Sequence, residues 1–91
     1  MEMKKVILVS GGSDGLGKGT SMQLVQTHTV VILAHNKEKV EKAAEEIGCD
    51  FVCADVSNYS EVEIAVQEVI AKYGQIDYLV NNAGFWIEGT L

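Results

Sequence analysis

The sequence predicts an α/β domain in which helices cover both faces of a parallel sheet of about four strands. Short apolar runs alternate along the chain with segments whose apolar residues recur at helical spacing. The runs are continuous rather than alternating, which is typical of strands buried on both faces of a parallel sheet. The resulting order β-α-β-α-β-α-β requires right-handed crossovers and places the strands in the spatial order 3-2-1-4. The expected architecture is therefore a three-layer, Rossmann-type sheet.

Length and composition narrow the classes of function. The chain has 91 residues, of which 47% are hydrophobic and 22% charged, so we expect one globular domain. A net charge of −6 argues against nucleic-acid binding, because phosphates attract basic surfaces. No apolar run approaches the roughly 20 residues that span a bilayer, and the apolar start is too short for a signal peptide. We therefore expect a cytoplasmic protein that does not enter a membrane.

The two cysteines, Cys49 and Cys53, fit reduced intracellular thiols. Both histidines lie far from them in the sequence, so the ligand count does not indicate a metal site. We predict no metal and no disulfide.

The first half of the chain supplies two strands and a helix. The first strand covers Val6–Val9 and the second Val30–Leu33, each an unbroken apolar run. Between them a helix is expected from Gly15 to about Gln26, although an interior Gly19 lowers its propensity by up to about 1 kcal/mol. Its predicted apolar face consists of Leu16, Met22, Leu24 and Val25.

The second half continues the alternation. Asn36 is expected to cap a second helix that ends at Gly48. The inward face of this helix is predicted to comprise Val40, Ala43, Ala44 and Ile47. A short third strand follows over 51–53, and its Cys53 is expected to face the core as a small hydrophobe.

The third helix carries a clear amphipathic pattern and precedes the last strand. Ser60 and Glu63 have the spacing of a capping box, which places the start of the helix near Ser60. Gly74 is expected to end it, and Tyr78–Val80 forms the fourth strand. Its apolar face is predicted to comprise Val62, Val66, Val69, Ile70 and Tyr73.

A glycine-rich loop over residues 10–17 joins the first strand to the first helix. A dinucleotide pyrophosphate needs backbone N–H donors at close range, and a helix N-terminus adds partial positive charge. We expect Gly11 to permit the turn, Gly15 to permit close approach of the phosphates, and Gly17 to permit tight helix–strand packing. An ordinary glycine-rich turn is the alternative, but the position after a buried strand and before a helix favours dinucleotide binding.

These residues resemble the short-chain dehydrogenase/reductase family along essentially the whole chain. The loop is similar to that family's T-G-x-x-x-G-x-G, with Ser10 in the threonine position. Asp55-Val56 looks like the family's acidic motif that contacts the adenine ring, although an aspartate here is also suited to capping a turn. Residues 81–84, Asn-Asn-Ala-Gly, are similar to the N-N-A-G run in which the first Asn holds the sheet and the backbone approaches the cofactor ribose.

The resemblance implies that residues 1–91 form a partial NAD(P)-binding Rossmann domain. The cofactor-binding residues that it implies, together with the adjoining loop positions, are Ser10, Gly11, Ser13, Gly15, Leu16, Gly17, His35, Asp55, Val56, Asn82, Ala83 and Gly84.

The choice between NADP and NAD depends on the end of the second strand. NAD-preferring members of the family carry an acid where this chain has Ala34, and His35 stands where NADP-preferring members often carry arginine. His35 and Lys37 favour NADP, whereas Asp14 in the loop opposes a 2′-phosphate. We expect NADP or NAD, with NADP preferred; the alternative for His35 is a plain polar loop residue.

The resemblance does not extend to a catalytic centre. The family's catalytic serine and Y-x-x-x-K pair lie beyond the N-N-A-G run, and no tyrosine in this sequence has lysine four positions on. Carbonyl reduction needs a proton donor beside the substrate oxygen, so we name no catalytic residue. We expect the NAD(P)-binding half of an oxidoreductase that is not catalytically competent alone.

The alternative function is a non-catalytic module that associates with itself. The fourth strand, around Ile76–Val80, is expected to lie at an open sheet edge, whose unpaired backbone groups invite another strand. A two-fold homo-oligomer would continue the sheet across two copies, with Phe85 and Trp86 adding apolar contact unless they merely bury the tail of the chain.

Overall fold

The computed structural model describes residues 5–11 and 15–81. Within these ranges all four strands are parallel and lie in the order β3-β2-β1-β4. The elements along the chain are β1 (Val6–Ser10), α1 (Gly15–Leu24), β2 (Thr29–Ala34), α2 (Lys37–Ile47), β3 (Asp50–Cys53), α3 (Tyr59–Tyr73) and β4 (Tyr78–Asn81). The predicted α/β class and the strand order 3-2-1-4 are confirmed.

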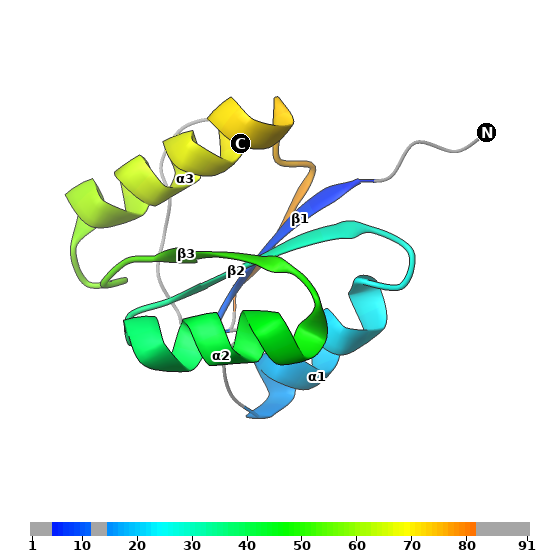
Figure 1. Ribbon diagram of the computed structural model, residues 1–91. Coiled ribbons are helices and arrows are strands. Elements are labelled where there is room, and N and C mark those ends of the chain that lie inside the picture. The colour runs from blue at the N-terminus through cyan, green and yellow to red at the C-terminus, as the bar shows by residue number, and fades with distance from the viewer. Residues whose placement is uncertain (1–4, 12–14, 82–91) are drawn as a thin grey trace.

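The helices form two layers around the sheet, with α1 and α2 on one face and α3 on the other (Figure 1). Side chains of β1 alternate between these layers, so Val6 and Leu8 pack in the core beneath α3, while Ile7 and Val9 pack beneath α1 and α2. All five residues of β1 are buried. This burial on both faces is the physical reason for the continuous apolar runs in the sequence.

Helix α1 turns a face of small residues toward the sheet. Gly17 and Ser21 are buried one turn apart, and the Ser21 hydroxyl donates a hydrogen bond of 2.8 Å to the Gly17 carbonyl. Leu24 and Val25 continue this face and are half-buried against the core. The prediction that Met22 belongs to the inward face is wrong, since its side chain is 48% exposed. Small residues let the helix approach the sheet closely, so apolarity alone misassigns the face.

The end of α1 also differs from the prediction. The helix ends at Leu24 rather than near Gln26. The next residues close two tight turns, in which the Thr27 and His28 N–H groups both donate to the Leu24 carbonyl. The chain needs these residues to reverse direction, because β2 already begins at Thr29.

Asparagine caps both later helices. Asn36 accepts from the Lys39 N–H at the start of α2, as predicted, and Gly48 ends that helix in a left-handed conformation. The predicted capping box of Ser60 and Glu63 is wrong: α3 begins at Tyr59, and Asn58 is its N-cap. Asparagine caps as well as serine, and Asn58 with Glu61 has the same spacing as Ser60 with Glu63, so the spacing of Ser60 and Glu63 does not by itself fix the start of the helix.

Strand β3 lies at one edge of the sheet, and its side chains follow that position. Val52 is buried beneath α3, whereas Cys53 points the other way and is exposed. The prediction that Cys53 faces the core is therefore wrong. Its thiol donates instead to the His35 carbonyl at 3.0 Å, across the edge formed by the ends of β2 and β3.

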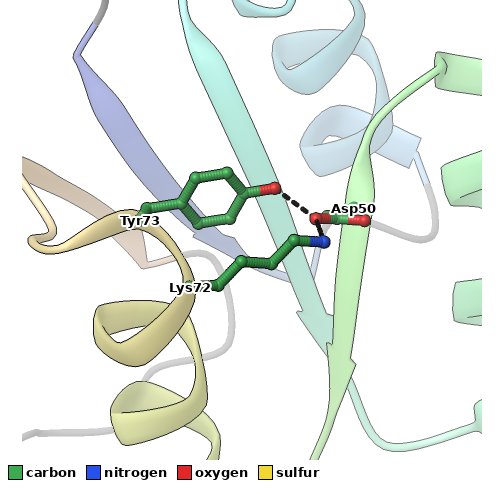
Figure 2. Close-up of polar contacts among 3 residues, drawn as sticks. All are labelled: Asp50, Lys72 and Tyr73. Atoms are coloured by element: carbon green, nitrogen blue, oxygen red, sulfur yellow. Dashed lines mark hydrogen bonds and ion pairs between the residues drawn. The ribbon is translucent and has the colours of Figure 1, made fainter.

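A polar cluster ties the end of α3 to the start of β3. Figure 2 shows Lys72 and Tyr73 directed from α3 toward the carboxylate of Asp50, to which both donate hydrogen bonds. Lys72, and secondarily Tyr73, hold the pKa of Asp50 below its ordinary value. This cluster lies at the amino-terminal ends of the strands and holds the end of α3 against the edge strand β3.

Helices α1 and α2 are linked in the same way on the other face, by an ion pair between Lys18 and Glu46. No helix within residues 5–11 and 15–81 has the length and apolar character needed to cross a bilayer.

Candidate functional site

The carboxyl ends of the four strands lie together at one end of the sheet, which we call the carboxyl edge. Ser10 lies level with Leu33 on one side and with Asn81 on the other. The chain leaves β1 toward β2 in one direction, while β4 lies beside β1 in the other, so this edge contains a topological switch point. In open α/β sheets the ligand binds at such a point, outside the carboxyl ends of the strands.

Ser10 and Asn81 join the two central strands at this edge. Ser10 is completely buried, and its hydroxyl donates to Asn81 Oδ1 at 3.0 Å, with the Val80 carbonyl oxygen at 3.4 Å. The bond crosses from β1 to β4 and fixes the start of the glycine loop against the start of the Asn-Asn-Ala-Gly run. This contact agrees with the sheet-holding role that the resemblance implies for Asn81.

Two glycines of the loop adopt conformations that other residues rarely adopt. Gly11 has φ of 68°, while its N–H still donates to the Leu33 carbonyl at 2.9 Å, so the chain turns immediately after its last sheet bond. Gly15, the first residue of α1, has φ of 51° and is exposed. A Cβ built on Gly15 would meet no atom within 4 Å. The glycine at this position therefore leaves open space beside the backbone at the start of a ten-residue helix.

Asp55 follows β3 at the same edge and is held in a tight turn. Its Oδ1 accepts from the Ser57 N–H at 2.9 Å and from the Ser57 hydroxyl at 2.7 Å. Its backbone N–H donates to Glu61 Oε1 at 3.2 Å, and its carbonyl accepts from the Asn58 N–H at 2.9 Å. The Ser57 hydrogen bonds lower the pKa of Asp55, and nearby His35 adds a smaller lowering. Asp55 is thus an ionised acceptor at neutral pH.

The structure describes only some of the predicted cofactor-binding residues. Those that it describes lie together at the carboxyl ends of the strands. Ser10, Gly11, Gly15, Gly17, His35, Asp55 and Val56 all lie at or next to the carboxyl ends of the strands. Leu16 lies in the first turn of α1, and its side chain is not described. The remaining predicted residues, Ser13, Asn82, Ala83 and Gly84, lie outside the described residues.

Sequence reasoning missed the residues that hold Asp55. Ser57 and Glu61 are not among the predicted site residues, and the cap that positions Glu61 is Asn58 rather than Ser60. The signal was present, because Asp-x-Ser is suited to a side-chain turn and Asn58 has glutamate three positions on. The Glu61 side chain does not complete a capping box with Asn58; its Oε1 accepts a hydrogen bond from the Asp55 N–H instead.

A separate open groove of about 450 Å³ lies at the opposite edge, where β2 and β3 begin. Its lining includes His28, Cys49, Asp50 and Tyr73, but none of the predicted site residues at the carboxyl ends of the strands. Burial raises the pKa of the Cys49 thiol to about 11, and Asp50 is already paired. Reactive groups are therefore scarce there, although His28 Nδ1 is buried with no hydrogen-bond partner among the described residues. No group of three or more potential metal ligands occurs in the described part of the chain.

The fold, together with the residues at the carboxyl ends of its strands, defines a class of protein: a Rossmann-type α/β domain with a glycine-rich loop between its first strand and first helix. The chain belongs to the short-chain dehydrogenase family of oxidoreductases, since the family model described as "short chain dehydrogenase" matches residues 5–91.

Individual relatives support the same assignment. The chain is 40% identical to a Staphylococcus aureus 3-oxoacyl-(acyl-carrier-protein) reductase over 98 residues, which cover 100% of the chain and 40% of the relative. It is 39% identical to Xenopus laevis carbonyl reductase family member 4, over 90% of the chain and 36% of the relative. The chain thus spans about two-fifths of the length of these relatives.

Solved structures share the fold. A short-chain dehydrogenase/reductase from Mycobacterium ulcerans superposes with a TM-score of 0.84 at 29% identity, over 92% of this chain and 34% of that one. An actinorhodin polyketide ketoreductase determined with NADPH gives a TM-score of 0.84 at 31% identity, over 89% of this chain and 33% of the ketoreductase.

Proposed function

We propose that this chain binds a nicotinamide adenine dinucleotide at the carboxyl edge of its sheet, as the cofactor-binding part of a short-chain dehydrogenase-like oxidoreductase. The observation that carries the proposal is Gly15, whose left-handed backbone and open Cβ position stand at the N-terminus of α1. A pyrophosphate needs this space, because a side chain there would separate the phosphate oxygens from the backbone N–H groups.

The remaining parts of the dinucleotide fit the other strand ends. Asp55 offers a carboxylate acceptor for the exocyclic amino group of adenine, and the neighbouring Val56 N–H has no partner among the described residues. We propose that His35, which is exposed just after β2, contacts the adenosine ribose and favours NADP over NAD, since a histidine side chain can carry positive charge. The resemblance implies that the backbone of Asn82, Ala83 and Gly84, which lie outside the described residues, approaches the cofactor ribose. The bound dinucleotide supplies hydride transfer.

We propose that this chain alone binds the cofactor without reducing a substrate. A carbonyl reduction needs a proton donor beside the substrate oxygen, and none of the sequence's tyrosines carries lysine four positions on. The chain covers about two-fifths of its relatives, whose substrates therefore do not transfer to it directly. On this proposal residues 1–91 are a partial NAD(P)-binding domain.

Isothermal titration of the chain with NADPH and with NADH tests cofactor binding. We expect saturable binding at a single site, tighter for NADPH, with weak affinity because the titrated chain spans about two-fifths of the length of its relatives. The variant His35→Ala is expected to reduce the NADPH preference and leave NADH affinity unchanged. Absence of saturation by either dinucleotide at millimolar concentration would refute the proposal.

Self-association through β4 is the second candidate function. Within the described residues β4 pairs only with β1, and Tyr78 on this strand is 57% exposed. Pairing of two β4 edges about a two-fold axis would continue the sheet and make a homodimer. Light scattering across a dilution series should give twice the chain mass, and Tyr78→Lys should restore the monomer. A monomer mass at all concentrations would contradict this candidate.

We also propose a cytoplasmic location, which suits the free thiols of Cys49 and Cys53. Recovery of the protein in a membrane or secreted fraction would contradict it.

A further inference from the structure

We propose that Ser57 and Glu61 are positioning residues of the dinucleotide site, which fix the Asp55 carboxylate so that its Oδ2 atom alone is presented to the base. The inference rests on the proposed function and adds to it a device that sets selectivity for adenine. Neither residue needs to touch the ligand, since both act through Asp55.

The side chain of Asp55 is fixed at one oxygen. Two donors from Ser57, the N–H at 2.9 Å and the hydroxyl at 2.7 Å, converge on Oδ1. Two hydrogen bonds to one oxygen restrict the rotation of the carboxyl group about its bond to the chain. No donor among the described residues reaches Oδ2. Within the described part of the chain the carboxylate therefore has one oxygen with hydrogen-bond partners and one without.

The backbone of Asp55 is fixed from the other side. Its N–H donates to Glu61 Oε1 at 3.2 Å and its carbonyl accepts from the Asn58 N–H at 2.9 Å. Glu61 in turn donates its own N–H to Asn58 Oδ1 at 3.3 Å, so the turn is tied to the first turn of α3. Val56 packs against the core beneath α3, which anchors the same turn from within. Oδ2 is then the one polar atom of Asp55 without a partner in the described part of the chain.

A fixed ionised carboxylate distinguishes bases by the sign of their hydrogen-bonding groups. A carboxylate only accepts hydrogen bonds. The Ser57 hydrogen bonds hold the pKa of Asp55 below its ordinary value, so it stays in this form at neutral pH. Adenine carries an amino donor at its 6-position, whereas hypoxanthine carries a carbonyl acceptor there. Asp55 therefore attracts one base and repels the other, and the precision of its placement determines how strongly.

The test compares the affinity of the full chain for NADH with its affinity for nicotinamide hypoxanthine dinucleotide. For the unmodified chain we expect roughly a tenfold preference for adenine, the size of one charge-assisted hydrogen bond. Ser57→Ala and Glu61→Ala are each expected to reduce this preference about threefold or more. Glu61→Gln, which keeps the acceptor oxygen, should restore it. Ser60→Ala and Glu63→Ala, at exposed positions of α3, are the matched controls and should leave it unchanged.

A purely structural role for Ser57 and Glu61 would lower both affinities equally and leave the preference unchanged, which would overturn the inference while the proposed function stands. A chain that binds NADH and the hypoxanthine analogue equally well would do the same. Titrations with AMP and IMP, followed by the amide resonances of Asp55 and Val56, isolate the adenine end. If neither dinucleotides nor AMP bind, the proposed function fails and the inference fails with it. The inference is supported if Ser57→Ala and Glu61→Ala lose the preference for adenine over hypoxanthine while the Ser60→Ala and Glu63→Ala controls keep it.

Discussion

Substitution of Gly15 by alanine separates the energetics of folding from those of phosphate binding. Gly15 has φ of 51°, and an added Cβ would meet no atom within 4 Å. The folded state therefore suffers backbone strain alone, about 1–2 kcal/mol for an L-residue in the left-handed region. Reduced freedom of the unfolded chain offsets about 0.4–1 kcal/mol of this. We expect Gly15→Ala to lower the free energy of unfolding by only about 1 kcal/mol.

Ligand binding should respond more strongly than stability. If the pyrophosphate binds at the start of α1 as proposed, the new methyl group would occupy the space through which it approaches, and backbone N–H bonds to phosphate would be lost. Each hydrogen bond to a charged group contributes about 1.5–3 kcal/mol, which corresponds to a loss of dinucleotide affinity of about tenfold to a hundredfold.

Gly48 offers a matched control for the same substitution. It also has a left-handed backbone, with φ of 83°, and a Cβ there would likewise meet no atom within 4 Å. Gly48 ends α2 at the opposite edge of the sheet. Gly48→Ala should therefore destabilise the chain by a similar amount, measured by urea unfolding, and leave NADPH affinity unchanged in isothermal titration. If Gly15→Ala binds NADPH as tightly as the unmodified chain, the inference that this glycine provides close approach of the phosphates is wrong.

Three further predictions concern stability and reactivity. Gly19→Ala should raise the free energy of unfolding by about 0.5–1 kcal/mol, because Gly19 is exposed inside α1 and has open space at Cβ; a loss of stability in urea unfolding would contradict this. Asp50→Asn should destabilise the chain at pH 7 by at most about 1 kcal/mol, since the Lys72 pair is partly exposed. Because the pKa of Asp50 is lowered in the folded state, its contribution to the free energy of unfolding is complete above the unfolded pKa near 4 and is lost as pH falls through the folded pKa. The stabilities of the unmodified chain and of Asp50→Asn should therefore converge in acid. A difference in stability that stays constant with pH would contradict the assignment. Iodoacetamide at pH 8 should modify exposed Cys53 well before Cys49, whose pKa is raised to about 11 by burial, and peptide mass mapping that shows equal rates would contradict this.

The elements of the fold were predictable because each strand or helix is encoded by nearby residues. The unbroken runs at β1 and β2 indicated strands buried on both sides, and Asn36 and Gly48 marked the two ends of α2. The strand order then followed from the handedness of crossovers between parallel strands. Ser10, Gly15 and Asp55 lie at the same end of the sheet because loops that follow parallel strands all emerge from their carboxyl ends.

The errors arose where a neighbour distant in the sequence decides the outcome. Met22 is more apolar than Ser21, yet Ser21 is buried because α1 must approach the sheet closely. Cys53 follows the alternation of β3, but the edge position of that strand leaves its side of the sheet uncovered at this point. Hydrophobicity indicates how favourable burial is for a side chain, and only the packed partner decides whether burial occurs.

By itself, the sequence determined the class of fold, the strand order and the position of the glycine loop, since these depend on local periodicity and on general rules of chain connection. Tertiary structure alone decided which atoms meet at the candidate site. The bond from Ser10 to Asn81 joins residues at the ends of two strands far apart in the chain, and the contact from Glu61 to Asp55 depends on where α3 begins. Hydrogen bonds act over about 3 Å, a precision that sequence patterns do not carry and that the packed sheet and helices impose.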